Sequence, residues 1–123
     1  VVFSGDTRAT NAIVTHSKGA DLLIHEAYNK SLMDRVATLV DELNISLDSK
    51  TMNNIAAVHT ETIALSKLAQ QAQVKSLVLT HMIPSIPAIG VAESYFMKGM
   101  SDFYSGDLSM ARDGTRIKID VRE

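Results

Sequence analysis

Ionisable side chains follow four short apolar runs of the chain. Each run is bounded by polar residues, as is typical of a strand buried in the sheet of an α/β protein. The runs, with the side chains that follow them, are Val1–Phe3 with Asp6, Leu22–Ile24 with His25 and Glu26, Ile55–Val58 with His59, and Leu77–Leu79 with His81. Carboxylates and imidazoles are ligands for Zn²⁺, Mn²⁺ or Fe, and α/β proteins build their sites at the carboxyl ends of strands. We therefore predict that these side chains meet at one rim of a sheet, with Asp6 and His81 as candidate ligands of a hydrolytic two-metal site.

Each of these residues also has an ordinary structural explanation. A single histidine at the end of a strand more often makes a hydrogen bond or a cap than a metal bond. Asp6 can serve as a turn residue or a helix cap, and Glu26 can be a solvated charge. The recurrence of ionisable groups at the same level of the topology favours the functional interpretation.

The apolar runs alternate with segments of helical periodicity, which predicts an α/β layered fold. We expect strands at 1–3, 20–25 and 75–81, a strand or a buried loop at 55–58, and helices at 8–18, 31–43, 60–72 and 88–98. Thr7, the pair Ser31 and Asp34, and Thr60 are the expected caps of the first three helices. Residues 44–54 have the composition of a polar connection.

The C-terminal segment has a different period. From Thr115 to Val121, apolar or neutral residues alternate strictly with charged ones, directly after Asp113-Gly114. Asp-Gly is the pair that a tight hairpin turn favours, and alternation is typical of a strand with one solvated face. The sequence therefore predicts a β-hairpin that begins at Leu108.

Composition limits the classes of protein that this chain can belong to. Its 123 residues suffice for one domain or part of one, and a net charge of −2 gives no electrostatic case for nucleic acid or a membrane surface. The absence of cysteine excludes disulfides and thiolate metal sites, and no apolar run is long enough to span a bilayer. Because the chain begins inside an apparent core strand, we expect a fragment or a processed chain. Its location stays open, with the cytoplasm favoured and an exported parent as the alternative.

Four segments, taken in order, resemble the C-terminal half of a metallo-β-lactamase-fold hydrolase of the ribonuclease Z and arylsulfatase-like branch. They are FSGDT (3–7), ADLLIHEAY (20–28), HTE (59–61) and KSLVLTH (75–81). The resemblance implies that residues 1–123 are half of an αββα sandwich, with a mixed sheet, helices and a C-terminal hairpin. It also implies that Asp6 bridges two zinc ions, that His81 is the last histidine ligand, and that Glu26 orients His59 to stabilise or protonate the leaving group.

Two departures from the family pattern bear on function. The His-x-His-x-Asp-His motif and the intermediate histidine ligand are absent, so we expect the chain alone to be inactive. Its partner would then be the missing N-terminal half or a second copy. Ribonuclease Z also has an arginine shortly after the final histidine, where this chain has MIPSIP (82–87). That difference makes tRNA a less expected substrate than a small phosphodiester, sulfate ester or other ester.

Two alternatives stay open. One is a non-enzymatic α/β binding or signalling module in which Asp6 accepts a phosphoryl group. The other is a stable structural remnant that binds a partner. Metal analysis separates the first from the hydrolase, and restoration of hydrolysis by the missing half separates the second.

Overall fold

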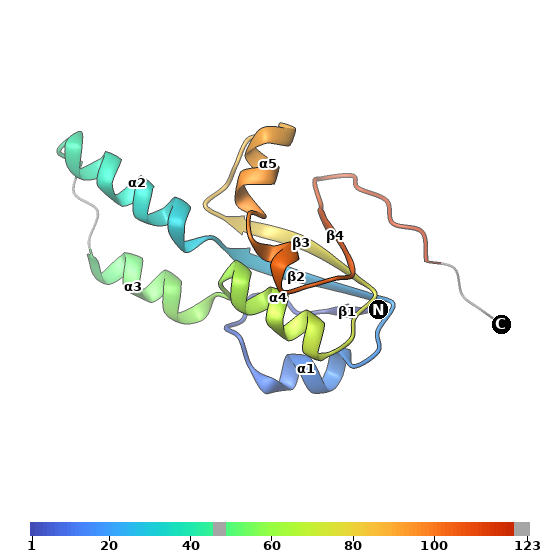
Figure 1. Cartoon of the computed structure of the whole chain (residues 1–123). Coiled ribbons are helices and arrows are strands. Elements are labelled where there is room, and N and C mark those ends of the chain that lie inside the picture. The colour runs from blue at the N-terminus through green and yellow to red at the C-terminus, as the bar shows by residue number, and fades with distance from the viewer. Residues whose placement is uncertain (46–48, 120–123) are drawn as a thin grey trace.

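The structure is a computed structural model that describes residues 1–45 and 49–119. Its centre is one sheet in the order β1-β2-β3-β4 (Figure 1). The strands are β1 (Val2–Phe3), β2 (Leu22–Tyr28), β3 (Ser76–Ile83) and β4 (Asp107–Met110). The helices are α1 (Asn11–Ser17), α2 (Lys30–Glu42), α3 (Ser49–Val58), α4 (Thr62–Gln71), α5 (Gly90–Phe96) and the 3₁₀ helix η1 (Met100–Asp102). The α/β class is confirmed, although the strand pairs of the described residues are all parallel and not mixed.

The strands β2 and β3 form the buried centre of the sheet, as their continuous apolar runs predict. The register pairs Leu23 with Leu77 and His25 with Leu79, so these side chains share one face. That face packs against side chains from α4, from the end of α5 and from the segment between α5 and β4. Those side chains include Leu65, Ala69, Phe96, Met100 and Tyr104. Each large apolar group buried here stabilises the fold by roughly 1.5–3 kcal/mol.

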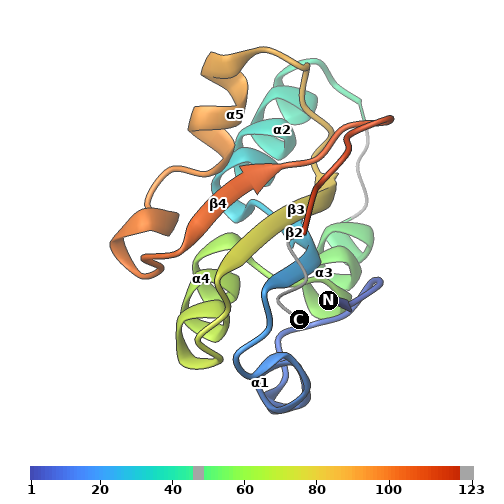
Figure 2. The ribbon, with the colours of Figure 1, turned by 90° about the vertical axis from the view of Figure 1, so that its right-hand side faces the viewer.

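The opposite face of the sheet carries Leu22 and Ile24 on β2 and Ser76 and Val78 on β3. Figure 2 shows the segment that follows β4 running back across this side of the sheet. Ile117, Lys118 and Ile119 of that segment line a pocket together with Leu22 and Ser76. The returning segment therefore covers part of this face, while Phe3 at its edge stays 66% exposed.

The prediction of a C-terminal hairpin is wrong for the described residues. β4 pairs with β3 in parallel, and residues 115–119 form no strand; the predicted end of the hairpin, 120–121, lies outside the described part of the chain. The alternation does not mark a strand with one buried face here, because Ile117, Lys118 and Ile119 all line the same pocket and Ile117 stays 42% exposed.

The prediction of a strand at 55–58 is also wrong. These residues form the end of α3, which includes most of the segment predicted to be a polar connection. Met52 and Ile55 are half-buried at a spacing of three, as on one face of a helix. The run of four apolar residues contains the last turn of a helix, and so His59 follows a helix and not a strand.

Helix starts depend on caps that differ from the predicted ones. Asn29, not Ser31, caps α2, because its side-chain oxygen accepts a hydrogen bond from Leu32 N at 2.9 Å. Thr10, not Thr7, precedes α1. Glu61, not Thr60, caps α4, and its Oε2 accepts from Ile63 N at 2.8 Å and Ala64 N at 3.1 Å. Thr7 and Thr60 are thereby free to take part in the contacts described below.

We expect Glu61→Ala to lower the free energy of unfolding by about 1 kcal/mol, because two N–H groups at the start of α4 lose their acceptor. Glu61→Gln keeps an acceptor of the same reach and serves as the matched control. Urea unfolding followed by circular dichroism measures both variants. Equal stability of the two variants would show that the cap contributes nothing.

Two helices extend away from the sheet. In Figure 1, α2 and α3 run outward from the body of the protein, and α5 rises beside the base of α2. The side chain of Asn29 joins this region to the core, because its Nδ2 donates a hydrogen bond to Phe96 O at 2.8 Å. Among the described residues, no helix has the length and apolar character needed to cross a membrane.

Candidate metal and catalytic site

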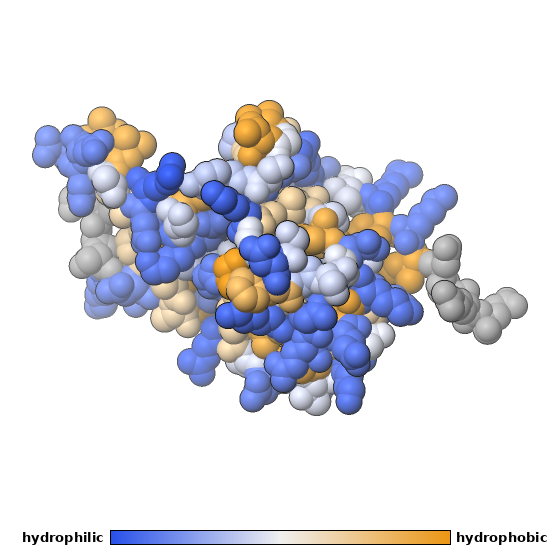
Figure 3. All heavy atoms as spheres, in the orientation of Figure 1, coloured by the Kyte–Doolittle hydropathy of each residue, from blue (hydrophilic) through white to orange (hydrophobic). Residues whose placement is uncertain are grey.

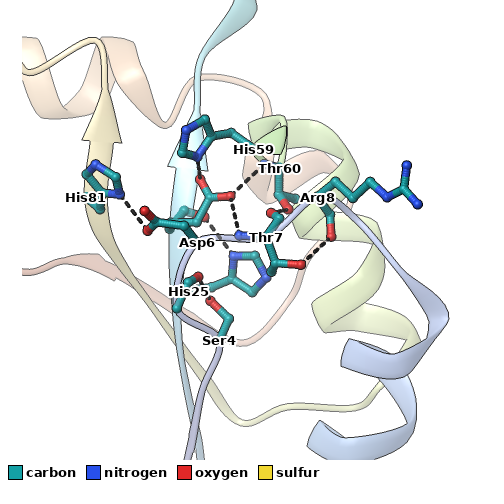
Figure 4. A network of polar contacts seen from close by, with 10 residues as sticks. Ser4, Asp6, Thr7, Arg8, His25, His59, Thr60 and His81 are labelled. Carbon is teal, nitrogen blue, oxygen red and sulfur yellow. Dashed lines mark hydrogen bonds and ion pairs between the residues drawn. The ribbon is translucent and has the colours of Figure 1, made fainter. Parts of the chain in front are cut away.

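The loop after β1 and the end of β3 bring Asp6 and His81 together. His81 Nδ1 lies 2.7 Å from Asp6 Oδ1 (Figure 4). The side chain of Asp6 is 61% exposed and that of His81 is 51% exposed, so the pair is accessible at the surface. The structure therefore places the two candidate ligands side by side, and their role as metal ligands stays a prediction.

The backbone of β3 is irregular at His81. Glu26 pairs with Thr80 and Ala27 pairs with Met82, so His81 is an extra residue without a partner on β2. It has a φ of 43°, a left-handed conformation that residues with a Cβ adopt rarely. A β-bulge of this kind redirects a side chain, and here it turns His81 toward Asp6. Backbone strain at a single residue is common at functional sites, where a side chain has to point in one particular direction.

Glu26 is buried beneath this pair and is held by backbone donors. Its Oε1 accepts hydrogen bonds from Thr60 N at 2.8 Å and from Thr7 N at 3.3 Å. Its Oε2 lies 3.4 Å from His59 Nδ1. Burial raises the pKa of Glu26 above its usual value, while the N–H of Thr60 and the neighbouring His59 act in the opposite direction. The carboxylate thus fixes three segments of the chain at one point.

His59 connects the buried carboxylate with the exposed pair. Its ring lies edge-on to the ring of His81, with the ring centres 5.6 Å apart. Thr60 holds this segment in place, because its Oγ1 donates to Thr7 O at 2.6 Å and its carbonyl accepts from Tyr28 N at 2.8 Å. The four predicted site residues, Asp6, Glu26, His59 and His81, are therefore gathered at one rim of the sheet. Figure 4 labels three of them, Asp6, His59 and His81.

His25 belongs to the core and not to this rim. Its side chain is fully buried, and its Nδ1 lies 2.7 Å from the carbonyl oxygen of Glu26. Its Nε2 has no hydrogen-bond partner among the described residues. Burial lowers the pKa of His25, although the contact with the Glu26 carbonyl opposes this effect. The imidazole therefore fits the fold in its neutral form.

We expect the stability of the chain to fall as the pH drops below 6.5, the ordinary pKa of histidine, in part because of His25. The unfolded chain takes up this proton before the folded chain does, so one such group contributes a slope of at most about 1.4 kcal/mol per pH unit. In His25→Gln the side chain is neutral at every pH. Urea unfolding between about pH 5 and pH 6.5 should then give a shallower slope than the wild type. An unchanged slope would contradict this account of His25.

The donor set at the rim fits part of a metal centre. Asp6 offers a carboxylate oxygen and His81 an imidazole nitrogen, both of which Zn²⁺ and Mn²⁺ accept. Within residues 1–45 and 49–119, no group of three histidine, aspartate or glutamate side chains lies close enough to hold an ion. Because a catalytic zinc takes about three protein ligands, a complete centre here needs donors from another segment.

A pocket of about 290 Å³ beside His81 contains a residue that the sequence analysis did not select. Its lining includes Thr80, Ser85 and Arg112. Arg112 follows β4, and its Nε donates a hydrogen bond to Glu93 Oε1 at 2.8 Å. The chain therefore brings an arginine to the neighbourhood of His81 from a distant segment. No local sequence motif predicts this position of Arg112, because it depends on the parallel pairing of β3 with β4.

Comparison with known proteins gives relatives of one kind. No family model matches the chain. Ribonuclease Z of Methanosarcina acetivorans is 34% identical over 82 residues, which are 67% of this chain and 21% of that protein. Ribonuclease Z of Haloferax volcanii is 27% identical over 119 residues, covering 97% of this chain and 31% of the relative. The chain thus spans about a fifth to a third of the length of these two relatives.

A solved structure supports the same comparison at the level of the fold. The metallo-β-lactamase fold protein YhfI from Bacillus subtilis aligns with a TM-score of 0.59 and 23% identity. The alignment covers 92% of this chain and 37% of that structure.

Proposed function

Since the chain is a metallo-β-lactamase-fold protein that resembles ribonuclease Z, we propose that it forms the C-terminal half of a metal-dependent hydrolase. The proposed substrates are phosphodiester bonds, and RNA is the first candidate because the relatives are named ribonuclease Z. The expectation that tRNA is less suitable depended on the segment after His81, which lacks an arginine. Arg112 at the pocket beside His81 weakens that expectation, because a guanidinium suits a phosphate.

One observation carries this proposal. The exposed pair of Asp6 and His81 lies directly above the buried pair of Glu26 and His59, although the four residues come from four separate segments. A carboxylate and an imidazole that are exposed together can serve a metal ion. A carboxylate and an imidazole that are buried together can position a proton donor. A hydrolase needs both functions at one place.

In this proposal Asp6 and His81 would hold the metal ion, which when bound supplies positive charge and a water of lowered pKa. Glu26 Oε2 faces His59 Nδ1 at 3.4 Å without a hydrogen bond, and a closer approach of these two atoms would fix the tautomer and the direction of the ring. The other ring nitrogen, Nε2, is left to donate a proton to the leaving oxygen as the bond between phosphorus and oxygen breaks. The N–H groups of Thr7 and Thr60 keep the Glu26 carboxylate in place during this step.

Completion of the enzyme from two segments tests the proposal. The chain would be co-expressed with the segment that precedes it in the parent protein, and metal content and turnover of bis(p-nitrophenyl) phosphate would be measured. We expect no turnover by the chain alone, and metal uptake with turnover by the pair. A purified pair that takes up no metal and shows no turnover would contradict the proposal that the chain is half of a metal-dependent hydrolase.

A further inference from the structure

The pairing of β4 with β3 brings Arg112 to the rim of the sheet that carries His81. The register pairs Leu79 with Met110, and beyond it Ala111 N donates a hydrogen bond to Leu79 O at 2.8 Å. Figure 2 shows the two strands side by side and pointing in the same direction. Arg112 therefore leaves β4 at the level of His81 on β3.

The order of the strands decides on which side of His81 the arginine lies. In the order β1-β2-β3-β4, Asp6 follows β1, His81 belongs to β3 and Arg112 follows β4. His81 turns its Nδ1 toward Asp6, whereas Arg112 comes from the strand beyond β3, and neighbouring strands lie about 4.8 Å apart. Arg112 is thus placed beside the proposed metal position, where it can reach a group next to the reacting bond.

Both the backbone and the side chain of Arg112 are held in place. Its N–H donates to Thr115 Oγ1 at 2.8 Å, and its carbonyl accepts from Thr115 N at 2.9 Å. Its Nε donates to Glu93 Oε1 at 2.8 Å, and its Nη2 donates to the same oxygen. Nη1 makes no hydrogen bond within the described part of the chain, and the side chain is 47% exposed. One edge of an oriented guanidinium is therefore left for an anion, and phosphate suits its geometry.

The pocket of about 290 Å³ between Arg112 and His81 combines polar and apolar walls. Thr80 and Ser85 supply hydroxyl groups, and the apolar part is formed by Met82, Ile86 and Ala111. Such a lining suits a nucleotide, whose phosphate takes the polar contacts and whose base or ribose takes the apolar ones. A small ester that ends at the reacting bond has no group to fill this space.

We propose that Arg112 binds the phosphate group next to the one that is hydrolysed, and that the nucleotide joining these two phosphates lies in the pocket beside His81. The proposal rests on the proposed function and narrows its substrate to a polynucleotide. Arg112 is then a specificity residue, because a small phosphodiester or a sulfate ester carries no second phosphate. Glu93 is a positioning residue that acts through Arg112.

Binding of uridine 5′-monophosphate to the metal-free, ¹⁵N-labelled chain tests this assignment by NMR. We expect saturable shifts of the signals of Ser85, Ala111 and Arg112, and weaker binding of uridine, which lacks the phosphate. Arg112→Gln should weaken the binding by about tenfold, the contribution of one hydrogen bond to a charged group. Arg112→Lys should retain part of it, because the charge remains and the planar fork is lost.

Two further variants separate a specific contact from a general effect of charge. Arg116→Gln removes the same charge from the same segment outside this pocket and is the matched control, with the affinity of the wild type expected. Asp113→Asn removes a negative charge from the lining and keeps a residue that suits the turn, so it should strengthen the binding. Absence of saturable shifts at the pocket, or equal weakening by Arg112→Gln and Arg116→Gln, would overturn the proposal. The NMR spectra also show whether each variant keeps its fold.

Kinetics of the completed enzyme distinguish the neighbouring phosphate from the hydrolysed one. Arg112→Gln should lower kcat/KM by a larger factor for RNA than for bis(p-nitrophenyl) phosphate, mainly through KM. Equal losses for both substrates, carried by kcat, would show that Arg112 contacts the hydrolysed phosphate and would overturn the proposal. A completed pair without turnover would contradict the proposed function, and the binding of uridine 5′-monophosphate would still decide on Arg112.

Discussion

Glu26→Ala is expected to lower the free energy of unfolding by about 3 kcal/mol or more. The Glu26 side chain is 1% exposed, and its removal leaves the N–H groups of Thr7 and Thr60 without their acceptor. Each buried donor left unsatisfied costs roughly 1–3 kcal/mol, and two donors lose their acceptor here. Urea unfolding at neutral pH provides the measurement.

Glu26→Gln is the control for this prediction. The amide keeps the volume of the side chain and can place its oxygen toward Thr60 N, so we expect a loss of about 1 kcal/mol. If the alanine variant were as stable as the glutamine variant, the backbone contacts of Glu26 would not hold the rim together.

In the completed enzyme, His59→Gln is expected to reduce kcat by about 10²–10⁴-fold, the usual contribution of a positioned proton donor. Metal content should not change, because the proposed ligands are Asp6 and His81. Glutamine retains hydrogen-bonding groups near Glu26, which limits the effect on folding. The measurement is turnover of a phosphodiester with an alkyl leaving group, together with metal analysis of the same sample.

A substrate with a better leaving group sharpens this test. Proton donation matters less when the leaving oxygen carries negative charge easily. The reduction of kcat caused by His59→Gln should therefore be larger for an alkyl leaving group than for p-nitrophenol. An equal loss for both substrates would show that His59 does not donate the proton. Loss of metal in the variant would assign His59 a different role.

The central strands were predictable from the sequence, and the elements outside the sheet centre were less so. Leu22–Ile24 and Leu77–Leu79 are continuous apolar runs, as is typical of strands buried on both faces. Ile55–Val58 gave the same local signal but is the end of α3, because a run of four apolar residues fits a helix turn equally well. The alternation at Thr115–Val121 predicted a strand, but residues 115–119 pair with no strand and line a pocket beside β2 and β3.

The proximity of Asp6, Glu26, His59 and His81 was predicted from the sequence motifs. The contacts that fix them were not predictable, because they are made by backbone groups. The N–H of Thr60 binds Glu26, and the bulge at His81 depends on a register shift between β2 and β3. Neither feature can be inferred from the types of the residues involved. Arg112 was missed for a similar reason, since its position depends on the pairing of β4 with β3.

In the proposed enzyme, Asp6 and His81 share one metal ion. Titration of the ¹⁵N-labelled chain with Mn²⁺, a paramagnetic ion that broadens nearby NMR signals, tests this position most directly. We predict that the signals of Asp6, Thr7 and His81 broaden first, and that Asp6→Asn removes this selectivity. Broadening centred elsewhere, or a pattern that Asp6→Asn leaves unchanged, would contradict the assignment of these two residues as metal ligands.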